Sequence, residues 1–137
     1  MSVKEIKAIA RRWYERWNKG KVAALATMDN ICAIDYVLHA GTGPDIHGLK
    51  DNKQDTTDVF NAFPDVHFTI DDMIAEGDKV ATRWTMTGTH KATNKTVTGW
   101  GITIDRIVGG KYMESWVRYD NLSMMQQLGL VPTPQKE

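Results

Sequence analysis

The sequence predicts an α+β fold, formed as a single domain over residues 1–137, in which helices precede an antiparallel sheet. An amphipathic helical pattern opens the chain, and the pattern changes after Pro64 to β-rich runs separated by short turns. Helices followed by strands favour α+β over an alternating βαβ architecture, since the two kinds of element are segregated along the chain. A chain of 137 residues suits one hydrophobic core.

The first helix is expected over residues 3–18. Ile6, Ala10, Trp13 and Trp17 recur at helical spacing and form one apolar stripe. Gly20 follows the pattern and can adopt the left-handed conformation that ends many helices. The two tryptophans either pack in the core or line a ligand cavity.

Two further helices and an apolar strand are expected before Pro64. They are a helix at 21–29, a strand at 31–39, a glycine-rich loop at 40–48 and a helix at 49–63. Tyr36 and His39 lie near the end of this strand. Pro64 ends the third helix because the residue before a proline is disfavoured in the helical region.

Four long β-like runs form the second half of the chain and predict an antiparallel meander. They cover 67–75, 80–90, 96–108 and 111–120, and a helix at 121–128 follows. Their apolar residues do not alternate cleanly. Either helices cover one face and a partner subunit the other, or the sheet curls around a partly polar cavity. Gly99 and Gly101, which flank Trp100, indicate a bulge or a tight bend.

The composition excludes several classes of function. Lysine plus arginine equals aspartate plus glutamate at 17 each, so the chain has no charge excess for a nucleic-acid or anionic-membrane surface. Little repulsion opposes self-association. The N-terminus has no apolar signal segment, which predicts a soluble, cytoplasmic protein. The single cysteine, Cys32, is expected to be a buried core thiol.

Asp120 is the first candidate for an acid–base residue. In an apolar cavity its pKa would rise, and it could then exchange protons near neutral pH. It also immediately precedes the helix expected at 121–128, where aspartate is a favoured N-cap. Both interpretations are consistent with the sequence.

His39 is the second candidate, as a proton-transfer group or polar anchor, against the alternative of a hydrogen-bonded structural histidine. The spacing of the four histidines predicts no metal site. Trp13, Trp17, Trp84 and Trp100 could line a pocket for a flat apolar ligand, or fill the core without binding one. Trp116 could support Asp120 or pack at a subunit interface.

Several motifs fall in order along the chain and together resemble the SnoaL-like polyketide cyclase (ester cyclase) family of the NTF2-like superfamily. These are F-P-D at 63–65, A-E-G-D-K-V-A-T-R at 75–83, G-T-H at 88–90, G-K-Y-M-E-S-W-V-R-Y-D at 110–120 and Q-Q-L-G at 126–129. The resemblance implies a cone in which N-terminal helices pack on a strongly curved antiparallel sheet enclosing a cavity. It also implies homodimers or larger homo-oligomers.

The resemblance further implies an intramolecular aldol ring closure of a polyketide ester, without metal or cofactor. In the family an aspartate acts as acid and base, and a histidine on the neighbouring strand assists it. This chain departs from that pattern. Thr103 stands where the histidine is expected, and if the aspartate belongs directly after the tryptophan, its counterpart here is Val117.

We therefore expect a cofactor-independent enzyme that performs acid–base chemistry, such as cyclisation, isomerisation or dehydration, on an apolar carbonyl or cyclic substrate. Asp120 and His39 are its expected catalytic residues. The expected substrate-binding residues are Trp13, Trp17, Tyr36, Trp84, Trp100, Thr103 and Trp116. The alternative is a binding protein or pseudoenzyme that uses the same cavity without chemistry. The expected partners are a small apolar or polyketide-like ligand and a second copy of the chain, with no nucleic acid and no membrane.

Overall fold

The computed structural model describes residues 1–134 and shows an α+β fold, as the sequence predicts. The helices are α1 (Val3–Glu15), η1 (Arg16–Lys19, a 3-10 helix), α2 (Lys21–Ile31), α3 (Leu49–Ala62) and α4 (Asn121–Gln127). The strands are β1 (Cys32–His39), β2 (Ile46–His47), β3 (His67–Glu76), β4 (Lys79–His90), β5 (Lys95–Val108) and β6 (Lys111–Tyr119). Within the described residues, no helix is long and apolar enough to cross a membrane.

One six-stranded sheet, in the order β2-β1-β6-β5-β4-β3, forms the frame of the molecule. The expected meander is present as β3 to β6, with antiparallel pairing throughout. The sheet as a whole is mixed, not antiparallel throughout, because β1 pairs with β6 in parallel. A parallel pair needs a long connection, and here β2, α3 and the strands β3 to β5 lie between β1 and β6 in the chain.

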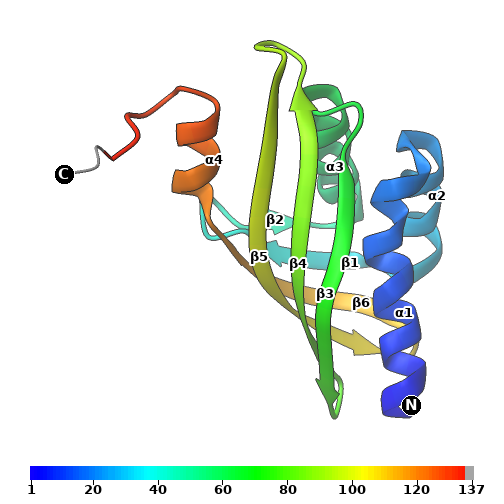
Figure 1. The fold of residues 1–137 in the computed structure, drawn as a ribbon. Helices are drawn as coiled ribbons and strands as arrows, with labels where there is room; N and C mark the ends of the chain where they lie inside the picture. The colour runs from blue at the N-terminus through cyan, green and yellow to red at the C-terminus, as the bar shows by residue number, and fades with distance from the viewer. Residues whose placement is uncertain (135–137) are drawn as a thin grey trace.

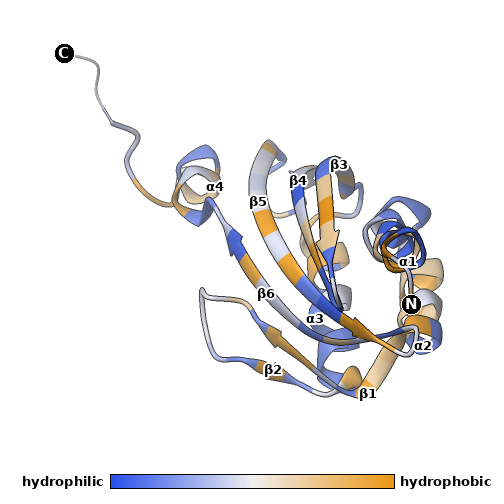
Figure 2. Cartoon of the chain, turned by 90° about the horizontal axis from the view of Figure 1, so that it is seen from below, coloured by the Kyte–Doolittle hydropathy of each residue, from blue (hydrophilic) through white to orange (hydrophobic). Residues whose placement is uncertain are grey.

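The sheet is curved and open (Figure 2), and α1, α2 and α3 pack against it. Helix α4 lies apart from them, at the far end of the sheet from α1 (Figure 1). The core beneath α1 is aromatic. The Trp13 ring stacks on Tyr112 with centroids 4.2 Å apart and meets the edge of Tyr36 at 5.5 Å. These three buried rings anchor α1 to β1 and β6.

The glycines around Trp100 do not form a bulge. The pairing of β4 with β5 continues through them without a register shift. They leave room for side chains instead: a Cβ on Gly101 would lie 2.3 Å from the Trp84 ring, and one on Gly99 would lie 2.8 Å from the sulfur of Met124. The sheet can therefore pack closely against Trp84 only because residue 101 has no side chain.

Candidate functional site

A cavity of about 310 Å³ lies between the curved sheet and the helices. Its volume is near the lower end of the range of small-molecule sites. Four large aromatic residues form much of its wall, namely Trp13, Trp17, Phe68 and Trp84. Trp17 stacks on Phe68, and Phe68 packs against Trp84, so the wall is continuous. This apolar surface fits a flat ligand.

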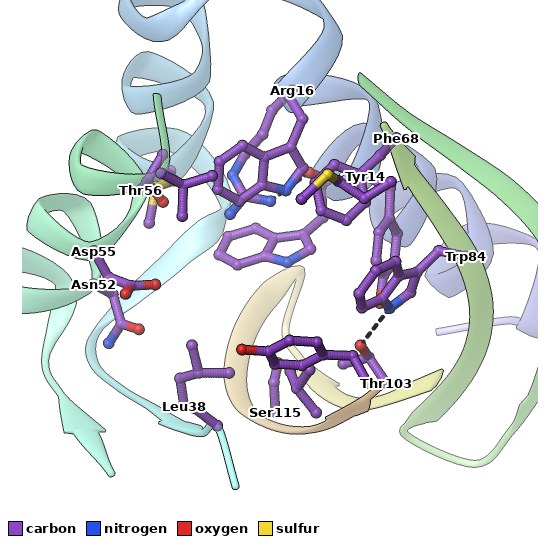
Figure 3. Close-up of a pocket in the computed structure, with 18 of the residues that line it drawn as sticks. Tyr14, Arg16, Leu38, Asn52, Asp55, Thr56, Phe68, Trp84, Thr103 and Ser115 are labelled. Atoms are coloured by element: carbon purple, nitrogen blue, oxygen red, sulfur yellow. Dashed lines mark hydrogen bonds between the residues drawn. The ribbon is translucent and has the colours of Figure 1, made fainter. Parts of the chain in front are cut away.

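Arg16 is a buried cation in this aromatic wall (Figure 3). It begins η1, and its guanidinium carbon lies 3.8 Å from the centre of the Trp13 ring and 4.5 Å from that of Trp17. Its Nη1 donates to the carbonyl oxygen of Trp13. Only 4% of the residue is exposed, and burial lowers its pKa from 12.5 to about 10. It therefore remains charged at neutral pH.

Asp55 is the single carboxylate lining the cavity within the part of the chain that the structure describes. It projects from the middle of α3 into the cavity (Figure 3). Burial raises its pKa, the nearby carboxylate of Asp58 raises it further, and the charge of Arg16 partly opposes both effects. A half-buried carboxylate with a raised pKa has the properties of an acid–base group.

Asn52, one turn before Asp55, is a polar neighbour in the same wall. Its Nδ2 donates to the carbonyl oxygens of Gly48, Ile46 and Tyr36 at 2.8, 3.2 and 3.3 Å. These bonds fix the amide so that its oxygen points toward the cavity (Figure 3). Asn52 thus joins the start of α3 to β1 and β2 and presents an acceptor to a ligand.

Asp105 lies beneath the cavity floor and is completely buried. It accepts hydrogen bonds from the hydroxyls of Ser115 at 2.5 Å, Tyr14 at 2.9 Å and Tyr112 at 3.2 Å. Burial raises its pKa to about 6, although the three hydroxyls act in the opposite direction. Of this group, Tyr14 and Ser115 reach the cavity.

Thr103 and Val117 lie opposite each other on β5 and β6, and both line the cavity. The family resemblance would place a histidine at position 103 and, if its aspartate belongs directly after the tryptophan, an aspartate at position 117. Thr103 accepts a hydrogen bond from the indole nitrogen of Trp84 at 2.9 Å. Neither side chain titrates in the physiological range, so this pair cannot exchange protons as a histidine–aspartate pair would.

Asp120 lies outside the cavity, at the N-cap of α4. Its carboxylate accepts a hydrogen bond from the backbone N–H of Ser123 at 3.0 Å, and the residue is exposed. The N-cap interpretation is therefore correct. The acid–base interpretation has no support in this geometry, because the strand ends at Tyr119 and the chain turns away into the helix.

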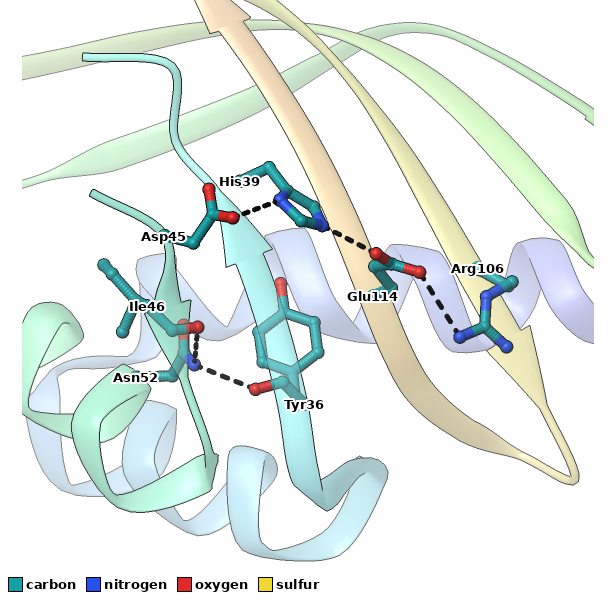
Figure 4. A network of polar contacts seen from close by, with 7 residues as sticks. All are labelled: Tyr36, His39, Asp45, Ile46, Asn52, Arg106 and Glu114. Atoms are coloured by element: carbon teal, nitrogen blue, oxygen red, sulfur yellow. Dashed lines mark hydrogen bonds and ion pairs between the residues drawn. The ribbon is translucent and has the colours of Figure 1, made fainter. Parts of the chain in front are cut away.

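His39 also lies outside the cavity lining, between two carboxylates (Figure 4). Its Nε2 is 2.6 Å from Glu114 and its Nδ1 is 2.9 Å from Asp45. The bond with Glu114 is the main cause that raises the pKa of His39. Glu114 in turn pairs with Arg106 at 3.4 Å. His39 is thus a hydrogen-bonded structural residue, as the alternative interpretation held.

The expected substrate-binding residues divide into two groups. Those that line the cavity are Trp13, Trp17, Tyr36, Trp84 and Thr103. Trp100 is 49% exposed on the outer face of β5, and Trp116 stacks on His39. These two side chains therefore lie outside the cavity lining, contrary to expectation. Successive side chains of a strand point to opposite faces of the sheet, and the neighbouring residues Gly101 and Ser115 face inward.

Sequence reasoning missed both charged residues of the cavity. Arg16 follows Trp13 by three residues and precedes Trp17 by one, so it borders the apolar stripe of the first helix. In the same way, Asp55 lies directly before Thr56, a residue of the inner face of α3. A charged residue at the edge of an apolar helical stripe was the available signal in both cases.

The fold defines an NTF2-like protein, with a cavity between its curved sheet and its helices. The chain belongs to the SnoaL-like polyketide cyclase family, whose sequence profile matches residues 7–128. No curated protein sequence matches the chain significantly.

Solved structures of the same fold support this assignment. AclR from Streptomyces galilaeus, provisionally described as a hydroxylase, has a TM-score of 0.85 and 25% identity, over 98% of this chain and 87% of its own. A protein from Bacillus cereus, provisionally described as a polyketide cyclase, has a TM-score of 0.80 and 29% identity, over 96% and 87%. IdmH from Streptomyces antibioticus, also provisionally described as a polyketide cyclase, has a TM-score of 0.79 and 27% identity, over 90% of this chain and 98% of its own.

Proposed function

We propose that this chain is a cofactor-independent enzyme that transfers a proton on a carbonyl-bearing, mostly apolar substrate held in the cavity. Asp55 is the acid–base group in this proposal. The supporting observation is that Asp55 is a half-buried carboxylate with a raised pKa, and that no other carboxylate among residues 1–134 lines the cavity. Family membership and the relatives described as polyketide cyclases support ring closure as the class of reaction.

The proposed chemistry begins with removal of a proton from the carbon next to a carbonyl. The Asp55 carboxylate takes this proton, and the electron pair left on carbon delocalises onto the carbonyl oxygen as an enolate. The enolate carbon then attacks a second carbonyl in a cyclisation, or is protonated elsewhere in an isomerisation. Asp55 returns the proton in either case, so no external reagent is consumed.

Exchange of a carbon-bound proton tests this step without knowledge of the natural substrate. The probe is 2-tetralone, a flat bicyclic ketone, in D₂O, with loss of the proton signal next to the carbonyl followed by NMR. The wild type should accelerate exchange over buffer, and Asp55→Asn should reduce that acceleration by about 10²-fold or more. Asp51→Asn is the matched control, because Asp51 is an exposed carboxylate one turn earlier on α3.

The competing function is ligand binding without chemistry. It is favoured by the neutral pair Thr103 and Val117, which line the cavity. The family resemblance would place acid–base residues at these two positions if its aspartate directly follows the tryptophan. Saturable binding of 2-tetralone without accelerated exchange would favour this function. Accelerated exchange that persists in Asp55→Asn would instead reject the role of Asp55.

A further inference from the structure

Arg16 is the feature of the cavity that proton transfer by Asp55 leaves unexplained. Its guanidinium lies against two indole rings and, among the described residues, makes one hydrogen bond, from Nη1 to the Trp13 carbonyl oxygen. Its Nε is buried without an acceptor, and no hydrogen bond from Nη2 to any residue in 1–134 is found. A buried donor without a partner is unfavourable, so these groups point to an acceptor that a ligand supplies.

Within residues 1–134, no carboxylate lies at ion-pair distance from Arg16. Each ion pair within residues 1–134 joins other residues, and Asp55, the carboxylate that shares the cavity, is not within ion-pair distance. Asp55 is nevertheless close enough for the guanidinium to influence its titration. The two charges therefore line the same cavity with space between them.

The chemistry of the guanidinium selects the kind of ligand group. A guanidinium is a planar array of N–H donors that matches the two oxygens of a carboxylate better than a single neutral carbonyl. Trp13 and Trp17 both lie against the guanidinium, so its N–H edge is the part that a ligand would contact. The adjoining wall of Trp17, Phe68 and Trp84 accommodates a flat conjugated body.

We propose that the ligand of this cavity is a flat, conjugated carboxylate whose anionic group binds the edge of the Arg16 guanidinium. This inference rests on the proposed function in naming the class of its substrate, but it concerns binding and not proton transfer. A neutral ester or amide of the same shape is then a poorer ligand, because it leaves the buried charge without a counter-charge.

Calorimetric titration with a matched pair of ligands tests the inference. The probes are 2-naphthoate and 2-naphthamide, which share a ring system and differ in charge. The wild type should bind the carboxylate at least about tenfold more tightly than the amide, a ratio that corresponds to about 1.4 kcal/mol. Equal affinities, a preference for the amide, or no saturable binding of 2-naphthoate would each overturn the inference, and none of these comparisons requires a variant.

Two variants assign the preference to Arg16. Arg16→Met keeps an unbranched side chain between the indole rings and should bind both probes equally. Arg11→Met is the charge-matched control, because Arg11 is exposed on α1 and lies outside the cavity lining, and it should retain the preference. A carboxylate preference that survives in folded Arg16→Met would overturn the role of Arg16.

Asp55→Asn separates this inference from the proposed function. Removing a nearby negative charge should leave the preference for 2-naphthoate intact or increase it. Failure of the proton-exchange test together with a carboxylate preference would reject the acid–base role and retain the anion site. Accelerated exchange without a carboxylate preference would reject the anion site and retain the acid–base role.

Discussion

At the residue scale, the sequence around Asp120 is consistent with either an acid–base residue or a helix N-cap, and the structure shows the N-cap. Its carboxylate caps α4, with the Ser123 N–H bond at 3.0 Å. Asp120→Ala should therefore lower the free energy of unfolding by about 0.5–2 kcal/mol, the usual effect of losing an N-cap. Chemical denaturation measures this loss. Loss of proton-exchange activity at unchanged stability would contradict the cap assignment.

The buried carboxylate of Asp105 makes stability depend on pH. Its pKa is raised from 3.8 to about 6 by burial, so the folded protein holds this proton more tightly than the unfolded chain does. The corresponding stability is present below about pH 4 and is lost as the pH rises through about 6, by roughly 3 kcal/mol. Other carboxylates, such as Asp65 and Glu114, have lowered pKa values and act in the opposite direction.

A comparison with Asp105→Asn isolates this contribution. The neutral amide cannot ionise, so the stability of the wild type relative to the variant should fall between pH 4 and pH 7. Urea denaturation at both pH values measures the difference. A relative stability that does not change with pH would show that the pKa of Asp105 is not raised in the folded protein.

Asp55 shows why the site was harder to predict than the fold. Helical periodicity places it next to the inner face of α3, but charged residues beside an apolar stripe usually face solvent. Its orientation depends on how α3 packs against β1, and Asn52 fixes that packing through carbonyl groups of β1, β2 and the residue before α3. These contacts are non-local, so a single sequence does not reveal them.

At the element scale, β5 leaves the space that the Trp84 ring occupies in the cavity wall. Gly101 lies where Trp84 crosses the sheet, and an added Cβ would meet the ring at 2.3 Å. Gly101→Ala should destabilise the protein by about 1–3 kcal/mol, because the indole must move within a packed core. A matched substitution at an open turn glycine, Gly43→Ala, should have little effect, since no atom lies near that position.

Thermal denaturation of the two variants checks this expectation. The melting temperature should fall for Gly101→Ala and stay close to that of the wild type for Gly43→Ala. An unchanged melting temperature for Gly101→Ala would show that the sheet can move away from Trp84 at small energetic cost.

The elements with strong periodicity were predictable from the sequence. The helices at α1 and α3 and the strands β3 to β6 follow local patterns and turn residues, and they lie within a few residues of their expected ranges. The parallel pairing of β1 with β6 was not predictable, because it joins segments separated by most of the chain. The sequence indicated a strand at 31–39 but not which strand of the sheet lies beside it.

At the scale of the whole molecule, the outer face of the sheet carries an exposed apolar surface. On β5 it includes Trp100, Ile102 and Ile104, which are 49%, 53% and 42% exposed, and Ile74 lies two strands away in the same lateral row as Ile104. Contiguous exposed apolar surface commonly marks an interface. We expect a homodimer through this face, and the near-zero net charge does not oppose it.

Light scattering coupled to size-exclusion chromatography tests the dimer. The expected mass is twice the 15.5 kDa of one chain, and Ile102→Lys should shift it toward the monomer by placing a charge in the apolar face. Ile34→Lys is the control, because Ile34 is 84% exposed on β1, which β6 separates from β5. A wild-type mass of one chain would contradict the expectation.

The central claim is that the acid–base group is the carboxylate in the cavity and not the one at the end of the last strand. A side-by-side measurement of 2-tetralone exchange by the wild type, Asp55→Asn and Asp120→Asn tests it most directly. Asp55→Asn should lose about 10²-fold or more of the acceleration, and Asp120→Asn should keep it at temperatures where the variant is folded. Normal exchange in Asp55→Asn would contradict the claim, and so would loss of exchange in folded Asp120→Asn.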